Sequence, residues 1–266
     1  MARAGQSTVR YGGDTACVQV NGSDGSVVIL DAGTGLLHVT KRIPEGTRRI
    51  DVLLTHLHMD HIQGLGFFYP LRSPEVETHI WGPVSNSAPL SDRLARYLSP
   101  PLFPVRLREL VANHSHDVLP GSFSIGGLEV TADLVCHPGP TLGYRLEEYG
   151  KAVVYLPDHE PALGHHVFPG DPRWTSGSDL ARGADLLIHD AQYTEDEYSR
   201  RVGWGHSTLA QAIGFARQMG VREFVTFHHD PEHSDDLLDE LHRRAQDDSD
   251  GVLQITPGMA GSEFDV

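Results

Sequence analysis

Residues 55–64 read "THLHMDHIQG" and directly follow the apolar run "IDVLL". Within six positions the stretch holds three histidines and one aspartate, at His56, His58, Asp60 and His61. The first two imidazoles lie on a loop that leaves a buried strand, so they can converge on one divalent ion. The aspartate and the third histidine, at the start of the next helix, indicate a second ion nearby. The stretch therefore predicts a dinuclear, hydrolytic metal site rather than a surface loop with unrelated histidines.

Four ligands do not complete two metal sites, so about three more are expected at other strand ends. Three candidates directly follow an apolar run, namely His137 in "LVCHPGP", Asp158 in "VVYLPDHE" and His228 in "FVTFHHD". His229 is the alternative to His228, because adjacent side chains that leave a strand point to opposite faces. For the same reason Cys136, beside His137, is predicted to be a buried structural thiol rather than a ligand.

The composition limits the class of protein. A chain of 266 residues with 39% hydrophobic content can bury one large core, which predicts a single α/β domain over residues 1–266. Lys plus Arg number 21 against 36 Asp plus Glu, and 21 − 36 = −15 opposes attraction to nucleic acid or to an anionic membrane. No apolar run approaches the roughly 20 residues of a membrane span, and "MARAGQSTVR" lacks the apolar core of a signal peptide. We therefore expect a cytoplasmic protein with Cys17 and Cys136 reduced.

Apolar runs separated by turn-forming residues predict two series of strands, each followed by helices. Strands are expected at "ACVQV" and "SVVIL" around the turn "NGSDG", then at "RRIDVLLTH", "VETHIWG", "PVRLREL", "LEVTADLVCH", "ADLLIHDA" and "REFVTFHH", with a hairpin about "EEYG". "IQGLGFFYP" is expected to be a short helical or turn segment. This order predicts two sheets covered by helices.

Two longer helices are predicted near the C-terminus. In "STLAQAIGFARQMG", Thr208 and Gln211 form a capping box, Gly220 is the stop, and Leu209, Ile213 and Ala216 share the apolar face. In "HSDDLLDELHRRAQ", a serine precedes acids in the first turn and arginines in the last, which suits the helix dipole.

"THLHMDH" resembles the HxHxDH motif of the metallo-β-lactamase superfamily, and the later His, Asp and His follow in that superfamily's order. The resemblance covers residues 8–234 and implies the αββα sandwich fold with two zinc ions, or manganese in their place. It implies that one ion is held by His56, His58 and His137 and the other by Asp60, His61 and His228, with Asp158 bridging.

Five further stretches are similar to one branch of that superfamily. They are "TVRYGGDTACVQV", "HPGPTLGYRLE", "HDAQYTEDEY", "GWGHST" and "FHHDP". The branch consists of tRNase Z-like phosphodiesterases and includes enzymes that cleave cyclic nucleotides. His58 separates the chain from the di-iron flavoproteins of the same fold, whose pattern places Glu there. The resemblance also implies a homodimer.

The predicted catalytic residues are His206, Asp190 and Asp60. Two zinc ions can provide a hydroxide and stabilise charge on a phosphodiester, but the leaving oxygen still needs a proton. His206 stands just before a capped helix, as a general acid could, and Asp190 could orient it. The competing interpretation is that His206 only packs at the helix entry and Asp190 caps a turn. For Asp31 in "DAGTG", a hydrogen bond to a ligand histidine and a purely structural turn are both open.

Three functions compete. The first is hydrolysis of a 3′,5′-cyclic nucleotide, a small anion that an acidic protein can attract through its metals. The second is tRNA 3′ processing, against which the segment 158–181 carries one basic residue, Arg173, where an RNA-gripping arm needs several. The third is a non-catalytic module that sequesters a nucleotide, against which the intact ligand set and His206 count. The same segment contains His159, His165 and His166, which are expected to be solvated loop histidines or part of a lid.

Overall fold

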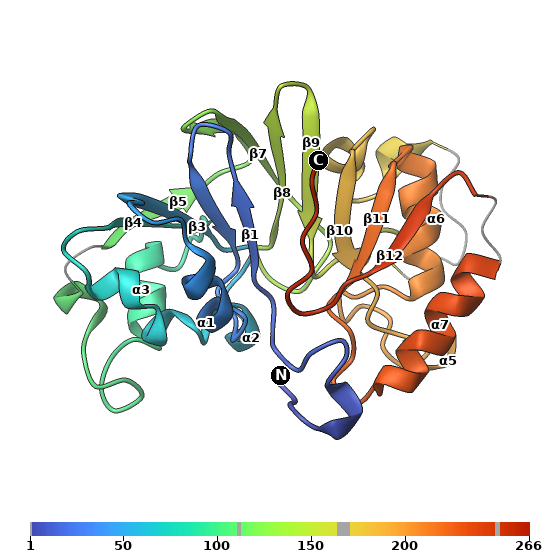
Figure 1. Cartoon of the computed structure of the whole chain (residues 1–266), viewed down its shortest axis with the longest axis horizontal. Coiled ribbons are helices and arrows are strands. Elements are labelled where there is room, and N and C mark those ends of the chain that lie inside the picture. Colours follow the sequence, from blue (N-terminus) through green and yellow to red (C-terminus); the bar gives the residue numbers. More distant parts are fainter. Residues whose placement is uncertain (1, 111–112, 164–170, 248–250) are drawn as a thin grey trace. The chain divides into compact units, whose positions relative to one another are not determined.

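The computed structural model describes residues 2–110, 113–163, 171–247 and 251–266 (Figure 1). Its internal contacts group the chain into two compact units. The N-terminal unit is Asp14–Glu129, and the C-terminal unit is Ala2–Gly13 together with Val130–Val266. The predicted α/β class is confirmed, because mixed sheets and helices make up the chain. The single domain over residues 1–266 stays a prediction.

The sheet of the N-terminal unit follows the order of the chain. Its strands are β1 (Val18–Asn21), β2 (Val27–Leu30), β3 (Arg49–Leu53), β4 (Glu77–Pro83) and β5 (Asn113–Val118), in the order β1-β2-β3-β4-β5. β1 and β2 pair antiparallel as the predicted hairpin, and the other neighbours pair in parallel. Parallel pairing brings the carboxyl ends of β2 and β3 to one edge, so the loops that follow them lie together.

Short helical segments cover one face of this sheet. They are α1 (Leu36–Val39), α2 (Met59–Ile62), α3 (Leu90–Ala95), and 3₁₀ turns at Thr40–Arg42, Leu65–Phe67, Tyr69–Arg72 and Leu107–Glu109. Ile50, Val52 and Ile80 alternate along β3 and β4 and are fully buried in the core of this unit. The strand predicted at "PVRLREL" is wrong: it is the 3₁₀ turn Leu107–Glu109, in which the Glu109 carboxylate accepts the Arg106 backbone N–H at 2.9 Å.

The C-terminal unit carries a second sheet. Its strands run in the order β12-β11-β10-β9-β8-β7 and are β7 (Leu128–Leu134), β8 (Leu142–Glu148), β9 (Lys151–Leu156), β10 (Leu186–Asp190), β11 (Glu223–Phe227) and β12 (Gln254–Pro257). β6 (Gly121–Ile125) precedes them in the chain. β8 and β9 form the predicted hairpin, with Tyr149 at φ 49° and Gly150 at φ 77° in its turn. β9, β10, β11 and β12 pair in parallel, so the ends of β9, β10 and β11 meet at one edge.

Helices pack on this sheet, and Figure 1 shows α6 beside β10 and β11 and α7 beside β12. The helical elements of the unit are α4 (Ser178–Ala181), α5 (Glu195–Tyr198), α6 (Leu209–Met219), α7 (Asp235–Asp247), and 3₁₀ turns at Gln6–Thr8 and Pro172–Trp174. The capping box of Thr208 and Gln211 and the left-handed Gly220 are confirmed. The apolar face is rotated from the prediction, because Ala212, Phe215, Ala216 and Met219 are buried while Leu209 and Ile213 lie at its edge. Among the described helices, none is long and apolar enough to span a bilayer.

Candidate metal centre

The N-terminal unit gathers the four side chains of the opening motif. β3 ends at Leu53, the chain turns through His56 and His58, and α2 begins at Met59 with Asp60 and His61 in its single turn. The His56 ring centroid lies 4.4 Å from that of His58 and 4.2 Å from that of His61. His56 and His61 are buried, whereas His58 is exposed and Asp60 half-buried. The local spacing thus brings these predicted ligands together within one unit.

A buried carboxylate, Asp31, lies behind two of these imidazoles. His61 Nδ1 donates to Asp31 Oδ2 at 2.8 Å. The Thr55 hydroxyl donates to the same oxygen at 2.9 Å and accepts from His56 Nδ1 at 3.0 Å. With both Nδ1 atoms used, the Nε2 atoms of His56 and His61 carry the lone pairs that a metal needs. Asp31 adopts φ 58° and also accepts the Thr55 backbone N–H at 2.7 Å. Of the two open interpretations of Asp31, the one in which it orients a ligand histidine fits its hydrogen bond with His61.

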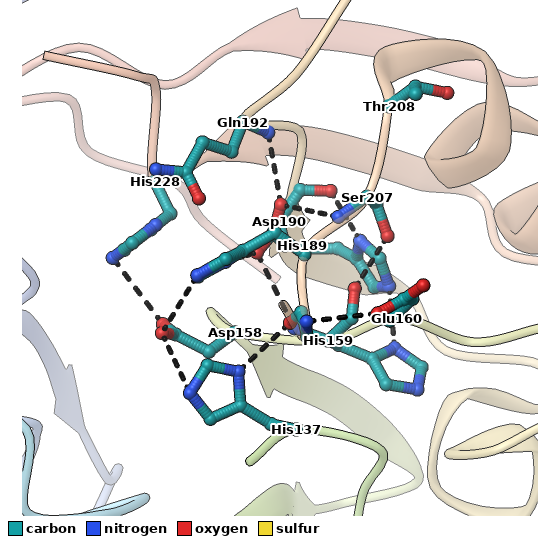
Figure 2. Close-up of polar contacts among 12 residues, drawn as sticks. His137, Asp158, His159, Glu160, His189, Asp190, Gln192, Ser207, Thr208 and His228 are labelled. Atoms are coloured by element: carbon teal, nitrogen blue, oxygen red, sulfur yellow. Dashed lines mark hydrogen bonds and ion pairs between the residues drawn. The ribbon is translucent and has the colours of Figure 1, made fainter. Parts of the chain in front are cut away.

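The C-terminal unit gathers the other predicted ligands around Asp158 (Figure 2). Asp158 follows β9, His137 follows β7 and His228 follows β11. Asp158 Oδ2 lies 3.7 Å from His137 Nε2, and Asp158 Oδ1 lies 3.5 Å from His228 Nε2. These gaps are too long for hydrogen bonds. They suit a carboxylate whose two oxygens each face an imidazole with room for an ion between them.

The orientation of His137 depends on the loop before His206. His137 Nδ1 donates to the carbonyl of Gly205 at 2.9 Å, which leaves Nε2 as the lone-pair atom directed at Asp158. Gly205 has φ 87°, and a Cβ at this position would lie 2.3 Å from His137 Nδ1. Only glycine therefore permits this approach. The hydrogen bonds behind His56, His61 and His137 fit divalent metal ligation by their Nε2 atoms.

The structure distinguishes His228 from His229. His228, at φ 55°, turns towards Asp158 as Figure 2 shows. His229 turns away, donates from Nε2 to the carbonyl of Gly258 at 3.3 Å, and meets the Tyr11 ring edge-on. Burial, as the main cause, lowers the pKa of His229 to about 3, and this imidazole is therefore neutral. His228 is accordingly the member of the pair that can act as a ligand.

The half-buried His206 and the fully buried Asp190 form a hydrogen-bonded pair. His206 Nδ1 donates to Asp190 Oδ2 at 2.6 Å, and Asp190 Oδ1 accepts the backbone N–H groups of Gln192 and Ser207, each at 3.0 Å. With Nδ1 bound, His206 directs Nε2 at Asp158 Oδ2, 3.9 Å away. Its ring stacks on His228 with centroids 5.1 Å apart. The imidazole is thus oriented by one carboxylate and presented beside the ligand group, as a proton donor requires.

One functional residue was missed by sequence reasoning. Glu160 is fully buried, and its carboxylate accepts the Tyr198 hydroxyl at 2.6 Å, the Gly203 N–H at 3.1 Å and the Gly205 N–H at 2.9 Å. It thereby holds the loop that orients His137 and leads into His206. No spacing signal in the chain connects Glu160 with a loop more than forty positions away.

The expectation that His159 is a solvated loop histidine is wrong. His159 is fully buried and donates from Nδ1 to His189 Nε2 at 2.8 Å, while His189 Nδ1 donates to the Asp190 carbonyl at 2.7 Å. Burial lowers the pKa of both imidazoles. The Ser207 hydroxyl donates to the His159 carbonyl at 2.6 Å, so this pair belongs to the interior that supports Asp190 (Figure 2). His165 and His166 lie outside the described residues.

Both cysteines are free thiols in the structure. Cys136 is half-buried and its backbone N–H donates to Ser176 Oγ at 2.8 Å. Burial first, and Glu160 second, raise the pKa of the Cys136 thiol. Burial also raises the pKa of Cys17 well above its ordinary value. Protonated, partly buried thiols agree with the predicted structural role of Cys136.

Comparison with known proteins gives a consistent result. The family described as "Beta-lactamase superfamily domain" matches residues 27–229. Ribonuclease Z of Myxococcus xanthus is 27% identical over 86% of this chain and 85% of its own. The metallo-β-lactamase fold protein YhfI of Bacillus subtilis superposes with a TM-score of 0.70 at 19% identity, covering 94% of this chain and 92% of its own. The short form of human tRNase Z superposes with a TM-score of 0.64 at 23% identity, covering 97% and 94%.

Proposed function

Because the chain belongs to the metallo-β-lactamase superfamily, in its tRNase Z-like branch, we propose that it is a metal-dependent phosphodiesterase. The observation that carries the proposal is the Asp190–His206 pair, in which His206 Nδ1 donates to Asp190 and Nε2 faces Asp158. A phosphodiesterase needs a proton donor for its leaving oxygen, and this pair supplies one beside a metal-ligand group. A site that only held metal would not need it.

The predicted ligands are part of this proposal. One ion is assigned to His56, His58 and His137, the other to Asp60, His61 and His228, and Asp158 is assigned to both. The family match over residues 27–229 includes all seven, which supports one hydrolase domain over residues 1–266. Zinc or manganese in such a site polarises the phosphoryl oxygens and supplies a nucleophile at neutral pH. The homodimer and the cytoplasmic location stay predictions.

Three carboxylates of the chain orient the ligand histidines and the proton donor. Asp31, through Thr55 for His56 and directly for His61, keeps those imidazoles in the ligating tautomer. Glu160 fixes the loop whose carbonyl orients His137. Asp190 accepts from His206 Nδ1 and stabilises the imidazolium, whose Nε2–H is the proton delivered to the leaving oxygen.

We propose a 3′,5′-cyclic nucleotide as substrate and a nucleoside monophosphate as product. The net charge of −15 favours a small anion over a long polyanion. Arg173, the one basic residue in segment 158–181, is already paired with Asp171 through its Nε at 3.0 Å. The chain offers no basic arm in the described part of that segment for gripping RNA phosphates. Simple β-lactams are expected to remain intact.

A second candidate is tRNA 3′ processing, which the names of the ribonuclease Z relatives favour. A direct comparison decides between the two. Metal-loaded protein is incubated with a panel of cyclic nucleotides and with precursor tRNA at moderate salt, and products are separated by chromatography. Conversion of cyclic nucleotides without tRNA cleavage supports the first candidate, and tRNA cleavage alone supports the second. Nucleotide recovered unchanged, with tRNA also intact, would indicate a sequestering module.

The role of His206 is tested by the leaving group. His206→Ala should lower turnover of a cyclic nucleotide by about 10² to 10⁴ while metal content and fold are retained. Bis(p-nitrophenyl) phosphate releases a stable phenolate that needs little protonation, so the variant should be far less impaired on it. Asp190→Asn should show the same pattern more mildly. Equal losses on both substrates, or loss of metal, would show that His206 does not deliver the proton.

A further inference from the structure

A second histidine cluster lies on the sheet of the N-terminal unit and is used by none of the functions above. Parallel pairing of β4 with β5 sets His79 directly opposite His114 and Trp81 directly opposite His116. Glu77 precedes His79 by two residues and therefore lies on the same face. Three imidazoles, one carboxylate and one indole thus share one patch on two neighbouring strands.

The side chains of this cluster are in close contact. His79 Nε2 lies 2.9 Å from Glu77 Oε1, and His114 Nε2 lies 3.5 Å from the same oxygen. The donor atoms of Glu77, His79 and His114 all lie within 4.8 Å of one another. The His79 and His114 rings stack with centroids 4.8 Å apart. The side chains of Glu77 and His114 are 53% and 54% exposed, so an ion can reach them, whereas that of His79 is only 11% exposed.

His116 and Trp81 hold the buried member in place. His116 Nε2 lies 2.8 Å from His79 Nδ1, and the two rings are parallel to within 6°. The Trp81 ring stacks on His116 at 4.1 Å, and its Nε1 donates to Asp51 at 2.8 Å. His79 therefore has one ring nitrogen engaged by a neighbouring imidazole and the other directed at Glu77. A hydrogen-bond partner on the second ring nitrogen fixes the ring orientation of a metal-binding histidine.

We propose that Glu77, His79 and His114 bind one divalent transition-metal ion of the zinc and copper class. Two imidazole nitrogens and one carboxylate oxygen are ligands that Zn²⁺ and Cu²⁺ favour, with water completing the coordination. In the free protein His116 Nε2–H donates to His79 Nδ1 and His79 Nε2–H donates to Glu77. When an ion takes the place of the Nε2 proton, that proton is carried on His79 Nδ1 instead and donates to His116, which becomes the other neutral tautomer. The number of protons bound by the two imidazoles does not change.

The ion would join β4 to β5 across their parallel pairing. Anything that binds the folded state alone stabilises it, so the ion should stabilise this edge of the sheet against opening. The site uses no predicted catalytic ligand, and it can therefore be present or absent whatever the activity of the protein.

Copper binding to the intact chain tests the proposal, with quenching of Trp81 fluorescence as the local signal because that ring stacks within the cluster. Wild type and Asp158→Ala are titrated with Cu²⁺, each with and without His114→Ala. In both backgrounds His114→Ala should lower the affinity of the quenching site at least tenfold and reduce bound Cu²⁺ by one equivalent. Glu77→Gln should also weaken binding. Zn²⁺, which does not quench, should compete with Cu²⁺.

Three further variants test whether the quenching signal reports an ion bound at this cluster. His38→Ala removes another exposed histidine of the same unit, one that pairs only with Asp14 in the ion pairs described, and should change nothing. Trp81→Phe should abolish the signal while the Cu²⁺ stoichiometry is kept. His116→Ala should weaken binding by about 10- to 100-fold, the usual effect of removing an orienting partner. Unchanged titrations in His114→Ala, or loss of the quenching site in Asp158→Ala alone, would overturn the proposal.

Discussion

Asp31→Asn is the substitution that most directly tests how the N-terminal ligand group is held. Asp31 is fully buried, and its carboxylate accepts from Thr55 N, from the Thr55 hydroxyl and from His61 Nδ1. Asparagine has the same shape and tolerates the left-handed backbone at φ 58°. The change therefore removes the charge and one acceptor while the backbone conformation is preserved.

These contacts set the expected size of the losses in zinc affinity and in unfolding free energy. The amide carbonyl can still accept from Thr55, but the amide nitrogen then faces the His61 Nδ1–H, donor to donor. One hydrogen bond to a buried charged group is lost, which is worth about 1.5–3 kcal/mol. At about 1.4 kcal/mol per tenfold change, zinc affinity should fall roughly 10- to 100-fold. The metal-free unfolding free energy should decrease by about 1–3 kcal/mol.

Zinc affinity is measured by competition with a chromophoric chelator, and stability by urea unfolding with chelator in excess. Asp185→Asn is the matched control, because Asp185 accepts the Ala152 N–H and pairs with Lys151 and Arg222 but with no histidine of the described part of the chain. It should leave zinc affinity unchanged. If Asp31→Asn binds zinc as tightly as wild type, Asp31 does not orient the ligand histidines and serves only the turn.

Three further outcomes are expected. Asp158→Ala should lower metal content and abolish turnover, whereas full retention of both would exclude Asp158 as the shared ligand. Glu160→Gln should reduce turnover and weaken metal binding together, since the loop it holds orients both His137 and His206; a loss of stability alone would contradict this. Burial holds the pKa of His189 below its ordinary value, so only the unfolded chain gains this proton as pH falls through about 6.5, and stability should decrease. In metal-free protein, the unfolding free energy measured in urea should rise with pH, and His189→Gln should reduce that slope by up to about 1.4 kcal/mol per pH unit. An equal slope in both proteins would show that His189 is not the group responsible.

Local signals determined much of what the sequence could predict. Alternating and continuous apolar runs marked the strands, and Thr208, Gln211 and Gly220 marked the ends of a helix, because these patterns depend on residues within a few positions. The motif from His56 to His61 was readable for the same reason, since its ligands follow one strand and enter one helical turn. The family resemblance then supplied the fold, which the comparisons confirm.

Other features were decided only by tertiary structure. Glu160 and Gly205 meet although they are 45 residues apart, and His159 meets His189 across 30. His228 faces Asp158 and adopts φ 55° at the end of β11, whereas the adjacent His229 contacts the Gly258 carbonyl. The second histidine cluster arises from the register of β4 with β5, which sets His79 beside His114. Sheet register and loop packing are set by the burial of a whole unit, so no local pattern in the chain encodes which distant polar groups they bring together.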